Sequence, residues 1–274
     1  MKRIVTAAVL IPIALALVFF APFWLFTLAC ALVAGLALWE YLDLADAIGA
    51  RCPRVASFLG LTAIYLCIWR YPDFLSATIL VIILAIFAFC TFHSPLDRLL
   101  PDIASSCFGI LYIGLAFATL PLLLEQTNGS SLLLFLFLAV WSGDAAALYI
   151  GKAFGRHKLA PHISPGKTWE GAIASLAASA LFTLFLLWVA AYLSAHSVNS
   201  LSYPGPWYRW LLLAIVVNAA AQLGDLAESG LKRSAGVKDS GTLLPGHGGV
   251  LDRIDALLLA APLLWYAHLA QQLF

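Results

Sequence analysis

Charge is scarce in this sequence. Lys and Arg number 15 and Asp and Glu 14, so charged residues make up 11% of the 274-residue chain, whereas soluble domains carry about 25%. Hydrophobic residues make up 63%, and the mean hydropathy is +0.95. This composition excludes a water-soluble enzyme, and we expect the lipid bilayer, not a nucleic acid, as the environment of the chain.

Cysteine pairs at metal-binding spacing are absent. The five cysteines, Cys30, Cys52, Cys67, Cys90 and Cys107, are scattered, mostly inside apolar runs. None belongs to a CxxC motif or lies at zinc-ligand spacing from a histidine. We therefore interpret them as packing residues and expect neither structural zinc nor disulfides.

No large polar insertion interrupts the apolar runs, several of which reach the roughly 20 residues that a helix needs to cross a membrane. The first run follows Lys2 and Arg3 and continues past Pro22 into the next run, so we interpret it as a retained helix and not as a signal peptide. The predicted fold class is all-α, a polytopic transmembrane helical bundle in a single integral membrane domain, 1–274. The nine expected spans are residues 4–20, 23–44, 56–69, 74–92, 103–124, 131–150, 170–194, 207–229 and 250–273.

The positions of the basic residues test this count of spans. With the N-terminus in the cytoplasm, nine spans place every Lys and Arg on the cytoplasmic side except Arg70 and Arg209, as the positive-inside rule requires. We therefore predict an N-in, C-out topology in a bacterial cytoplasmic (inner) membrane. The expected parts are an N-terminal helical part (1–130) and a catalytic part (131–274) with two long, Gly-rich, basic cytoplasmic loops (151–169 and 230–249).

Acidic residues near the C-terminus form two pairs at helical spacing. Asp225 and Glu228 are three residues apart near the end of one expected span, as are Asp252 and Asp255 at the start of the next, so each pair shares a helix face. Ionised residues inside spans cost about 2.5–3.5 kcal/mol each on insertion scales and usually face a polar cavity or a partner. Carboxylates without Cys or His suit a hard cation, so we expect Mg²⁺ bound together with a nucleoside triphosphate.

Basic residues and glycines fill the stretch between the two acidic pairs. Lys232, Arg233 and Lys238 offer donors to phosphate oxygens, and the glycines allow backbone N–H groups to approach a polyphosphate closely. The alternative is a flexible basic loop at lipid headgroups, with one of the acids paired to Lys232 or Arg253 inside the bundle. His247 is a candidate proton carrier, phosphate ligand or loop-ordering donor, and the sequence leaves these roles open. The glycines are Gly236, Gly241, Gly246, Gly248 and Gly249.

A second polar group lies in the loop 151–169. Its Gly166-Lys167-Thr168 resembles the end of a P-loop, but that motif needs a glycine where this chain has Pro161, and it needs a preceding strand, so we reject it. Ser164, Lys167 and Thr168 precede an expected helix whose N-terminus can bind an anion. Thr168 or Ser164 is equally well explained as the N-cap of that helix.

The run from Ser229 to Asp255 resembles the signature of the phosphatidate cytidylyltransferase family. It reads S-x-L-K-R, four residues, K-D-x-G, then L-P-x-H-G-G-x-x-D-R-x-D, with every fixed position filled. The resemblance implies an enzyme of phospholipid biosynthesis that joins CTP and phosphatidate to give CDP-diacylglycerol and pyrophosphate. It also implies a requirement for Mg²⁺, room for K⁺ as a second cation, and a homodimer.

The resemblance and the residue types together assign roles to individual residues. Asp225 and Asp252 match the metal-binding acids of the family, and Asp144 and Asp255 are placed near the metal with them. The expected catalytic residues are Lys167, Lys232, Arg233, Lys238, Asp239, His247 and Arg253, of which the first four bind phosphates. The expected substrate-binding residues are Ser164, Thr168, Ser229, Gly248 and Gly249.

Two other classes of membrane protein compete with this interpretation. A secondary transporter would use Asp144, Asp225 and Asp252 as ion-coupling residues, which explains the acids but not the Lys- and Gly-rich loop. A CDP-alcohol phosphotransferase would carry D-G-x-x-A-R with two downstream aspartates, and this pattern is absent from the sequence.

Overall fold

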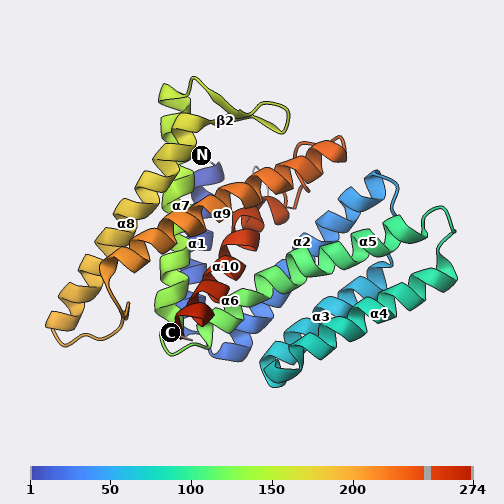
Figure 1. Cartoon of the computed structure of the whole chain (residues 1–274), viewed down its shortest axis with the longest axis horizontal. Coiled ribbons are helices and arrows are strands. Elements are labelled where there is room, and N and C mark those ends of the chain that lie inside the picture. Colours follow the sequence, from blue (N-terminus) through green and yellow to red (C-terminus); the bar gives the residue numbers. More distant parts are fainter. Residues whose placement is uncertain (1, 244–247, 273–274) are drawn as a thin grey trace. The chain divides into compact units, whose positions relative to one another are not determined.

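The computed structural model describes residues 2–243 and 248–272. This part of the chain contains nine continuous helical stretches, because η1 leads into α4, and α5, η2 and α6 follow one another without a break (Figure 1). Each of the nine expected spans falls on one of these stretches. Their elements are α1 (Lys2–Phe20), α2 (Phe23–Ala47), α3 (Arg54–Arg70), η1 (Pro72–Phe74), α4 (Leu75–His93), α5 (Leu99–Gly109), η2 (Ile110–Leu115), α6 (Ala116–Leu124), α7 (Gly129–Phe154), α8 (Trp169–Ala195), α9 (Trp207–Ser234) and α10 (Leu251–Gln272).

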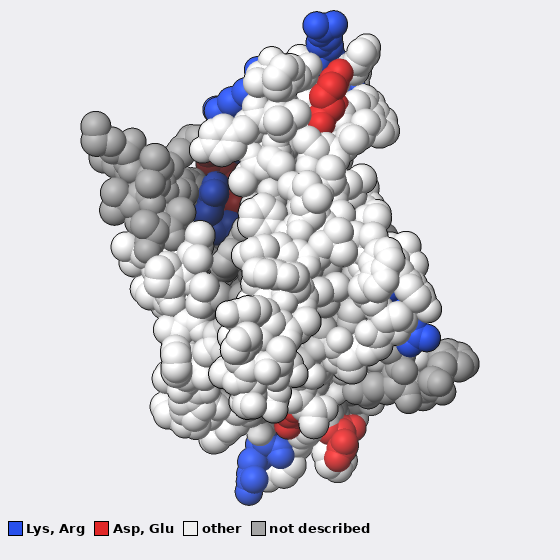
Figure 2. All heavy atoms as spheres, turned by 90° about the vertical axis from the view of Figure 1, so that its left-hand side faces the viewer, with Lys and Arg blue, Asp and Glu red and all other residues white. Residues whose placement is uncertain are grey.

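Six of these stretches are long and apolar enough to cross a membrane, so the chain is a polytopic helical membrane protein. Apolar side chains on them face outward: Leu80, Val81 and Phe87 of α4 are each more than half exposed. Most of the surface in Figure 2 is uncharged, and its charged side chains form small separate groups. The six stretches are Phe23–Ala47, Pro72–His93, Leu99–Leu124, Gly129–Phe154, Trp169–Ala195 and Trp207–Ser234.

The expected loop 151–169 contains a β-hairpin, which the sequence did not predict, within a chain that is otherwise mainly helical as expected. Strands β1 (Lys158–Ala160) and β2 (Ser164–Thr168) pair antiparallel, with Lys158 opposite Thr168. An isolated two-stranded hairpin is only marginally stable. Here its strands contact α7 and α8, and it extends from the ends of these two helices (Figure 1). His157 and Glu170, which flank the hairpin, are also in hydrogen-bond contact, with His157 Nδ1 2.6 Å from Glu170 Oε1.

The chain forms two compact units, each built from two separate segments. Unit 1 consists of Met1–Leu122 and Leu231–Ile254, and unit 2 consists of Leu123–Gly230 and Asp255–Phe274. The first boundary lies close to the expected division at residue 130. Residues 231–254, however, belong with the N-terminal helices and not with the rest of the expected catalytic part. The signature run is therefore shared between the two units.

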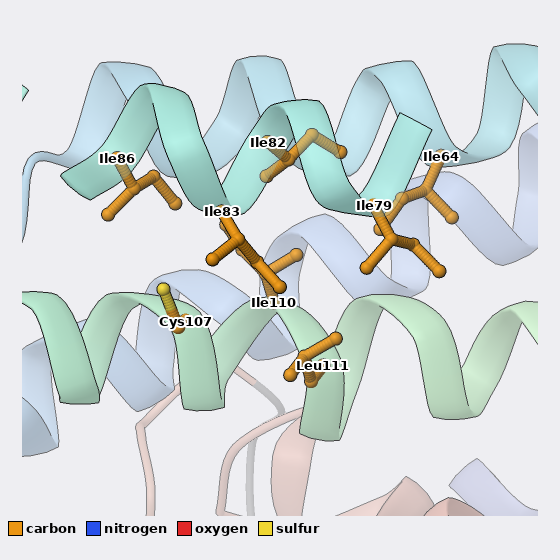
Figure 3. A pocket seen from close by; sticks show the side chains of 8 residues that line it. All are labelled: Ile64, Ile79, Ile82, Ile83, Ile86, Cys107, Ile110 and Leu111. Carbon is orange, nitrogen blue, oxygen red and sulfur yellow. The ribbon is translucent and has the colours of Figure 1, made fainter. Parts of the chain in front are cut away.

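Unit 1 is held together by close packing of apolar helices. Side chains of α3, α4, α5 and η2 line a narrow apolar pocket, in which Ile83 and Ile110 lie between the facing helices (Figure 3). Gly109 brings α5 close to α2, since a Cβ at this position would lie only 2.5 Å from the Tyr41 ring. The Tyr41 hydroxyl also donates to the Ser105 carbonyl at 3.1 Å. These contacts fix the C-terminal half of α2.

Unit 2 contains a buried polar seam between its helices. Asn218 of α9 donates to the Ala139 carbonyl at 3.1 Å and accepts hydrogen bonds from Ser175 at 3.0 Å and Gln222 at 2.8 Å. A Cβ at Gly143 would overlap the Asn218 side chain, so glycine is needed at this crossing. Hydrogen bonds and small residues of this kind hold membrane helices together, because lipid supplies no hydrophobic driving force.

The cysteines behave as packing residues. All five are free thiols, and all but Cys107 are buried. Burial raises the pKa of the Cys52 thiol, in the turn between α2 and α3, to about 11. This thiol is therefore protonated at neutral pH, as expected of an inert structural cysteine.

Candidate active site

Unit 2 contains a cavity of about 440 Å³ that is lined by α7, by both strands of the hairpin, and by α8 and α9. Four of its lining residues, Asp144, Lys167, Thr168 and Asp225, were expected at the active site from the sequence. Gln222 connects the cavity wall to the buried polar seam through its hydrogen bond to Asn218. The helices that line this cavity are therefore anchored beneath it by buried hydrogen bonds.

Lys167 and Asp225 form an ion pair at this cavity. The Lys167 Nζ lies 2.7 Å from Asp225 Oδ2, and the two side chains are 24% and 38% exposed. The sequence assigned Lys167 to phosphate and Asp225 to a metal ion, and the structure brings the two together. The partner of Asp225 in unit 2 is therefore a lysine of the hairpin.

Three carboxylates of unit 2 lie within electrostatic reach of a fourth, Asp255. Asp255 of α10 interacts with Asp225, Glu228 and Asp144, and Glu228 is fully buried. Like charges at such proximity repel one another unless a cation or a proton compensates them. In the described ranges, no group of three or more His, Cys, Asp or Glu side chains is arranged to hold a metal ion. The donor set fits Mg²⁺ all the same, since Mg²⁺ in nucleotide sites takes one or two protein carboxylates and completes its shell with phosphates and water.

Thr168 is the N-cap of α8. Its buried hydroxyl accepts a hydrogen bond from the Gly171 amide at 3.2 Å, which confirms the capping interpretation. The Trp169 amide donates to the His157 carbonyl at 2.9 Å. Two of the first amides of α8 are therefore already used within the protein, so Lys167 is the better anion-binding group of this segment. Ser164 lies at the start of β2 and is half-buried.

Thr168→Ala is expected to lower the free energy of unfolding by about 1 kcal/mol, the usual value of a lost N-cap. Thr168→Ser, which keeps the hydroxyl, is expected to cost much less. Denaturation of the purified variants in mixed detergent measures the difference. Equal stability of the alanine and serine variants would contradict the capping role.

A second cluster of charged residues lies in unit 1 around Asp252. Its Oδ1 lies 2.5 Å from Lys232 Nζ, and its Oδ2 accepts hydrogen bonds from the Ser240 amide at 3.0 Å and the Gly249 amide at 2.8 Å. The Ser240 hydroxyl also lies 3.0 Å from this oxygen. Lys232, Ser240 and Asp252 are all buried. The structure thus contains the intramembrane pair that the sequence left open as an alternative for Asp252. Asp225 belongs to unit 2 and Asp252 to unit 1. The binding of cations by these two residues stays a prediction.

The signature glycines make room for protein carboxylates. Gly248 has a φ of +76°, which other residues rarely adopt. A Cβ at Gly248 would lie 2.5 Å from Asp252 Oδ2, and one at Gly249 would overlap Ser240 and Glu40. The sequence predicted that these glycines approach a polyphosphate, but the structure gives them partners within the chain.

The remaining predicted residues are placed as follows. Ser229 is buried in α9. Arg233, Lys238, Asp239 and Arg253 are exposed, and Arg233 donates to the Val237 carbonyl at 2.9 Å. His247 and Gly246 lie outside the described residues.

Sequence reasoning missed Glu40, a buried carboxylate of α2. It accepts hydrogen bonds from the amides of Val250 and Leu251 and from the Ser240 hydroxyl. The signal was present in the sequence, because a carboxylate inside a mainly apolar run implies a buried polar partner. That partner lies some two hundred positions away, which no local pattern reveals.

The sequence of this chain is similar to those of known proteins. Residues 1–270 match the cytidylyltransferase family. The chain is 36% identical to the phosphatidate cytidylyltransferase of Haemophilus influenzae, with 97% of this chain and 98% of the relative covered. It is also 36% identical to that of Pseudomonas aeruginosa, with 97% of each covered.

A more similar segment is shared with the phosphatidate cytidylyltransferase of Brucella suis, at 46% identity over 158 residues. That match spans about half of each protein, 57% of this chain and 54% of the relative. The nearly full-length relatives and the family match agree with the signature between Ser229 and Asp255. The chain therefore belongs to the cytidylyltransferase family.

Proposed function

We propose that this protein transfers a cytidylyl group from CTP to phosphatidate, giving CDP-diacylglycerol and pyrophosphate. The observation that carries the proposal is the cavity of unit 2, where Lys167 meets Asp225 beside a group of carboxylates. The negative triphosphate matches the positive charge of Lys167, and its cation matches the negative charge of Asp225. The names of the relatives supply the substrates.

The chemistry is a single nucleotidyl transfer. A phosphate oxygen of phosphatidate attacks the α-phosphorus of CTP, a new P–O bond forms, and the bond to the pyrophosphate oxygen breaks. No residue of the protein becomes covalently attached. Lys167 places a positive charge against the phosphates, so the protein acts by positioning the reactants and compensating their charge.

Asp225 and Asp252 are the proposed ligands of cations, with Asp144 and Asp255 near them. When bound, Mg²⁺ neutralises negative charge on the phosphates. K⁺ is the proposed second cation. The carboxylate-rich, thiol-free donor set around Asp225 supports a hard cation. Lys232, Arg233, Lys238, Asp239 and Arg253 are the proposed phosphate-binding and supporting residues of the signature run.

The proposed topology has nine crossings of the bacterial inner membrane, with the N-terminus and the active site in the cytoplasm. This topology is supported by the positive-inside rule, because it places all Lys and Arg residues except Arg70 and Arg209 on the cytoplasmic side. In this arrangement CTP arrives from the cytoplasm, and phosphatidate reaches the site from the membrane interface. The resemblance to the family further supports a homodimer, which the detergent-corrected mass from light scattering tests.

Labelling of engineered cysteines is expected to confirm this orientation. A membrane-impermeant maleimide should label Lys238→Cys only in inside-out vesicles and Asn199→Cys only in right-side-out vesicles. The unmodified chain is the control, because four of its five cysteines are buried. Labelling of both positions from the same side would contradict the proposed topology.

A secondary transporter is not favoured, because the family match and the full-length relatives name a transferase. The deciding experiment incubates the purified protein with labelled CTP, phosphatidate and Mg²⁺ and extracts lipid-soluble cytidine product. The product should require all three components, and pyrophosphate should appear in equal amount. No lipid product with any phosphatidate species would overturn the proposed function.

A further inference from the structure

The carboxylate of Glu40 is buried in unit 1 and lies outside every sequence motif of the chain. We infer that Glu40 is a positioning residue for the proposed transfer, which holds the start of α10 and, through Ser240, the carboxylate of Asp252. The inference rests on the proposed function, because Asp252 is one of its site residues.

Glu40 caps the N-terminus of α10 from a distant position in the sequence. Its Oε1 accepts from the Val250 amide at 2.9 Å, and its Oε2 accepts from the Leu251 amide at 2.8 Å. The residue before α10 is Val250, which has no side-chain acceptor, so these amides would otherwise be buried without partners. A carboxylate at this end of a helix also interacts favourably with the helix dipole. The first turn of α10 is therefore fixed by α2.

Ser240 connects Glu40 with Asp252. Its hydroxyl lies 2.9 Å from Glu40 Oε2 and 3.0 Å from Asp252 Oδ2. A hydroxyl has one proton, so Ser240 donates to one carboxylate at a time. The hydrogen bonding of Asp252 thus depends on the group at position 40. Glu40, Ser240 and Asp252 are all less than one tenth exposed, so water does not weaken this connection.

Two glycines of the signature run fit closely around Glu40. A Cβ at Gly241 would lie 2.5 Å from Glu40 Oε1, and one at Gly249 would overlap Oε2. Glycine at these two positions allows the backbone to reach the carboxylate from both sides. Glu40 therefore explains two signature glycines, in addition to its three hydrogen bonds.

Glu40→Gln is the decisive change, because it keeps the shape but turns one acceptor oxygen into an NH₂ donor. At least one of the three donors then loses its acceptor. We expect the Val250 and Leu251 amides to exchange with deuterium about fivefold faster, the factor for one lost hydrogen bond. We also expect the Mg²⁺ concentration at half-maximal rate to rise about tenfold, as for other groups that orient a ligating residue.

Asp102→Asn is the matched control. Asp102 is a buried carboxylate of the same unit, and its Oδ1 accepts from the Arg51 amide at 2.7 Å, so the change removes the same kind of contact elsewhere. It should leave both the exchange at Val250 and Leu251 and the Mg²⁺ dependence unchanged. Ser240→Ala keeps the hydrogen bonds of Glu40 to α10. It should raise the Mg²⁺ requirement without faster deuterium exchange at Val250 and Leu251. This variant serves as the test if Glu40→Gln does not fold.

Unchanged exchange in Glu40→Gln would show that Glu40 does not fix the start of α10. A loss of kcat at an unchanged Mg²⁺ requirement would leave Glu40 a purely structural residue. Either result would overturn the inference. Equal effects of Asp102→Asn would do the same. If the unmodified protein makes no lipid product, the proposed function fails by itself, and the exchange measurement still decides whether Glu40 fixes the start of α10.

Discussion

Asp252→Asn is expected to lower turnover at least about a thousandfold, equivalent to several kcal/mol of lost transition-state stabilisation. The carboxylate of Asp252 binds Lys232 and accepts hydrogen bonds from the amides of Ser240 and Gly249. Asparagine keeps the volume but removes the charge, so both the ion pair and the proposed cation ligand are lost. Initial rates of CDP-diacylglycerol formation over a range of Mg²⁺ concentrations measure the effect.

This substitution also destabilises the protein, because it neutralises the carboxylate with which buried Lys232 pairs. Removing one partner of a buried pair costs about 3–5 kcal/mol. Combining Asp252→Asn with Lys232→Met removes both charges of this pair, so the double variant should regain stability without regaining turnover. Near-normal turnover of the single variant at ordinary Mg²⁺ would remove Asp252 from the proposed cation-binding residues.

Lys167→Met is expected to lower kcat about a hundredfold to a thousandfold, the usual effect of removing one donor that stabilises developing charge. Methionine preserves the length of the side chain and leaves Asp225 without its partner at 2.7 Å. Lys167→Arg restores the charge but presents a planar group, so partial activity is expected. Steady-state kinetics with CTP as the varied substrate measure the effect.

Lys158→Met provides the matched control for Lys167. Lys158 lies on β1 of the same hairpin, is exposed, and does not line the cavity of unit 2. Its replacement should leave kcat unchanged. A Lys167→Met variant with normal kcat and a raised KM would show that Lys167 binds ground state and transition state equally, which contradicts its proposed role.

The helices could be predicted because each apolar run is long enough to determine its own structure. All nine expected spans fall on helices, and most differ only at their ends, as where α5 begins at Leu99 and not at residue 103. The hairpin was missed because three and five residues are too few to show an alternating pattern. Its stability comes from contacts with α7 and α8, which the sequence of the hairpin does not encode.

The chemistry of the site could be predicted only as a set of residue types. The sequence named Lys167, Asp225, Lys232 and Asp252, but it could not tell which lysine meets which aspartate, because tertiary packing decides the pairing. Gly249 was assigned to a phosphate for the same reason, although a protein carboxylate occupies its vicinity. Glu40 was missed entirely, since its partners follow two hundred or more positions later.

The division of the chain into two interleaved units has a practical consequence for protein engineering. Neither unit is a continuous stretch, because residues 231–254 interrupt the sequence of unit 2 and complete unit 1. A fragment that begins near residue 123 would carry the whole signature run but would lack α2, and with it the acceptor for the first amides of α10. Screening for inhibitors or split reporters therefore needs the uninterrupted polypeptide, and tags are best confined to its two ends.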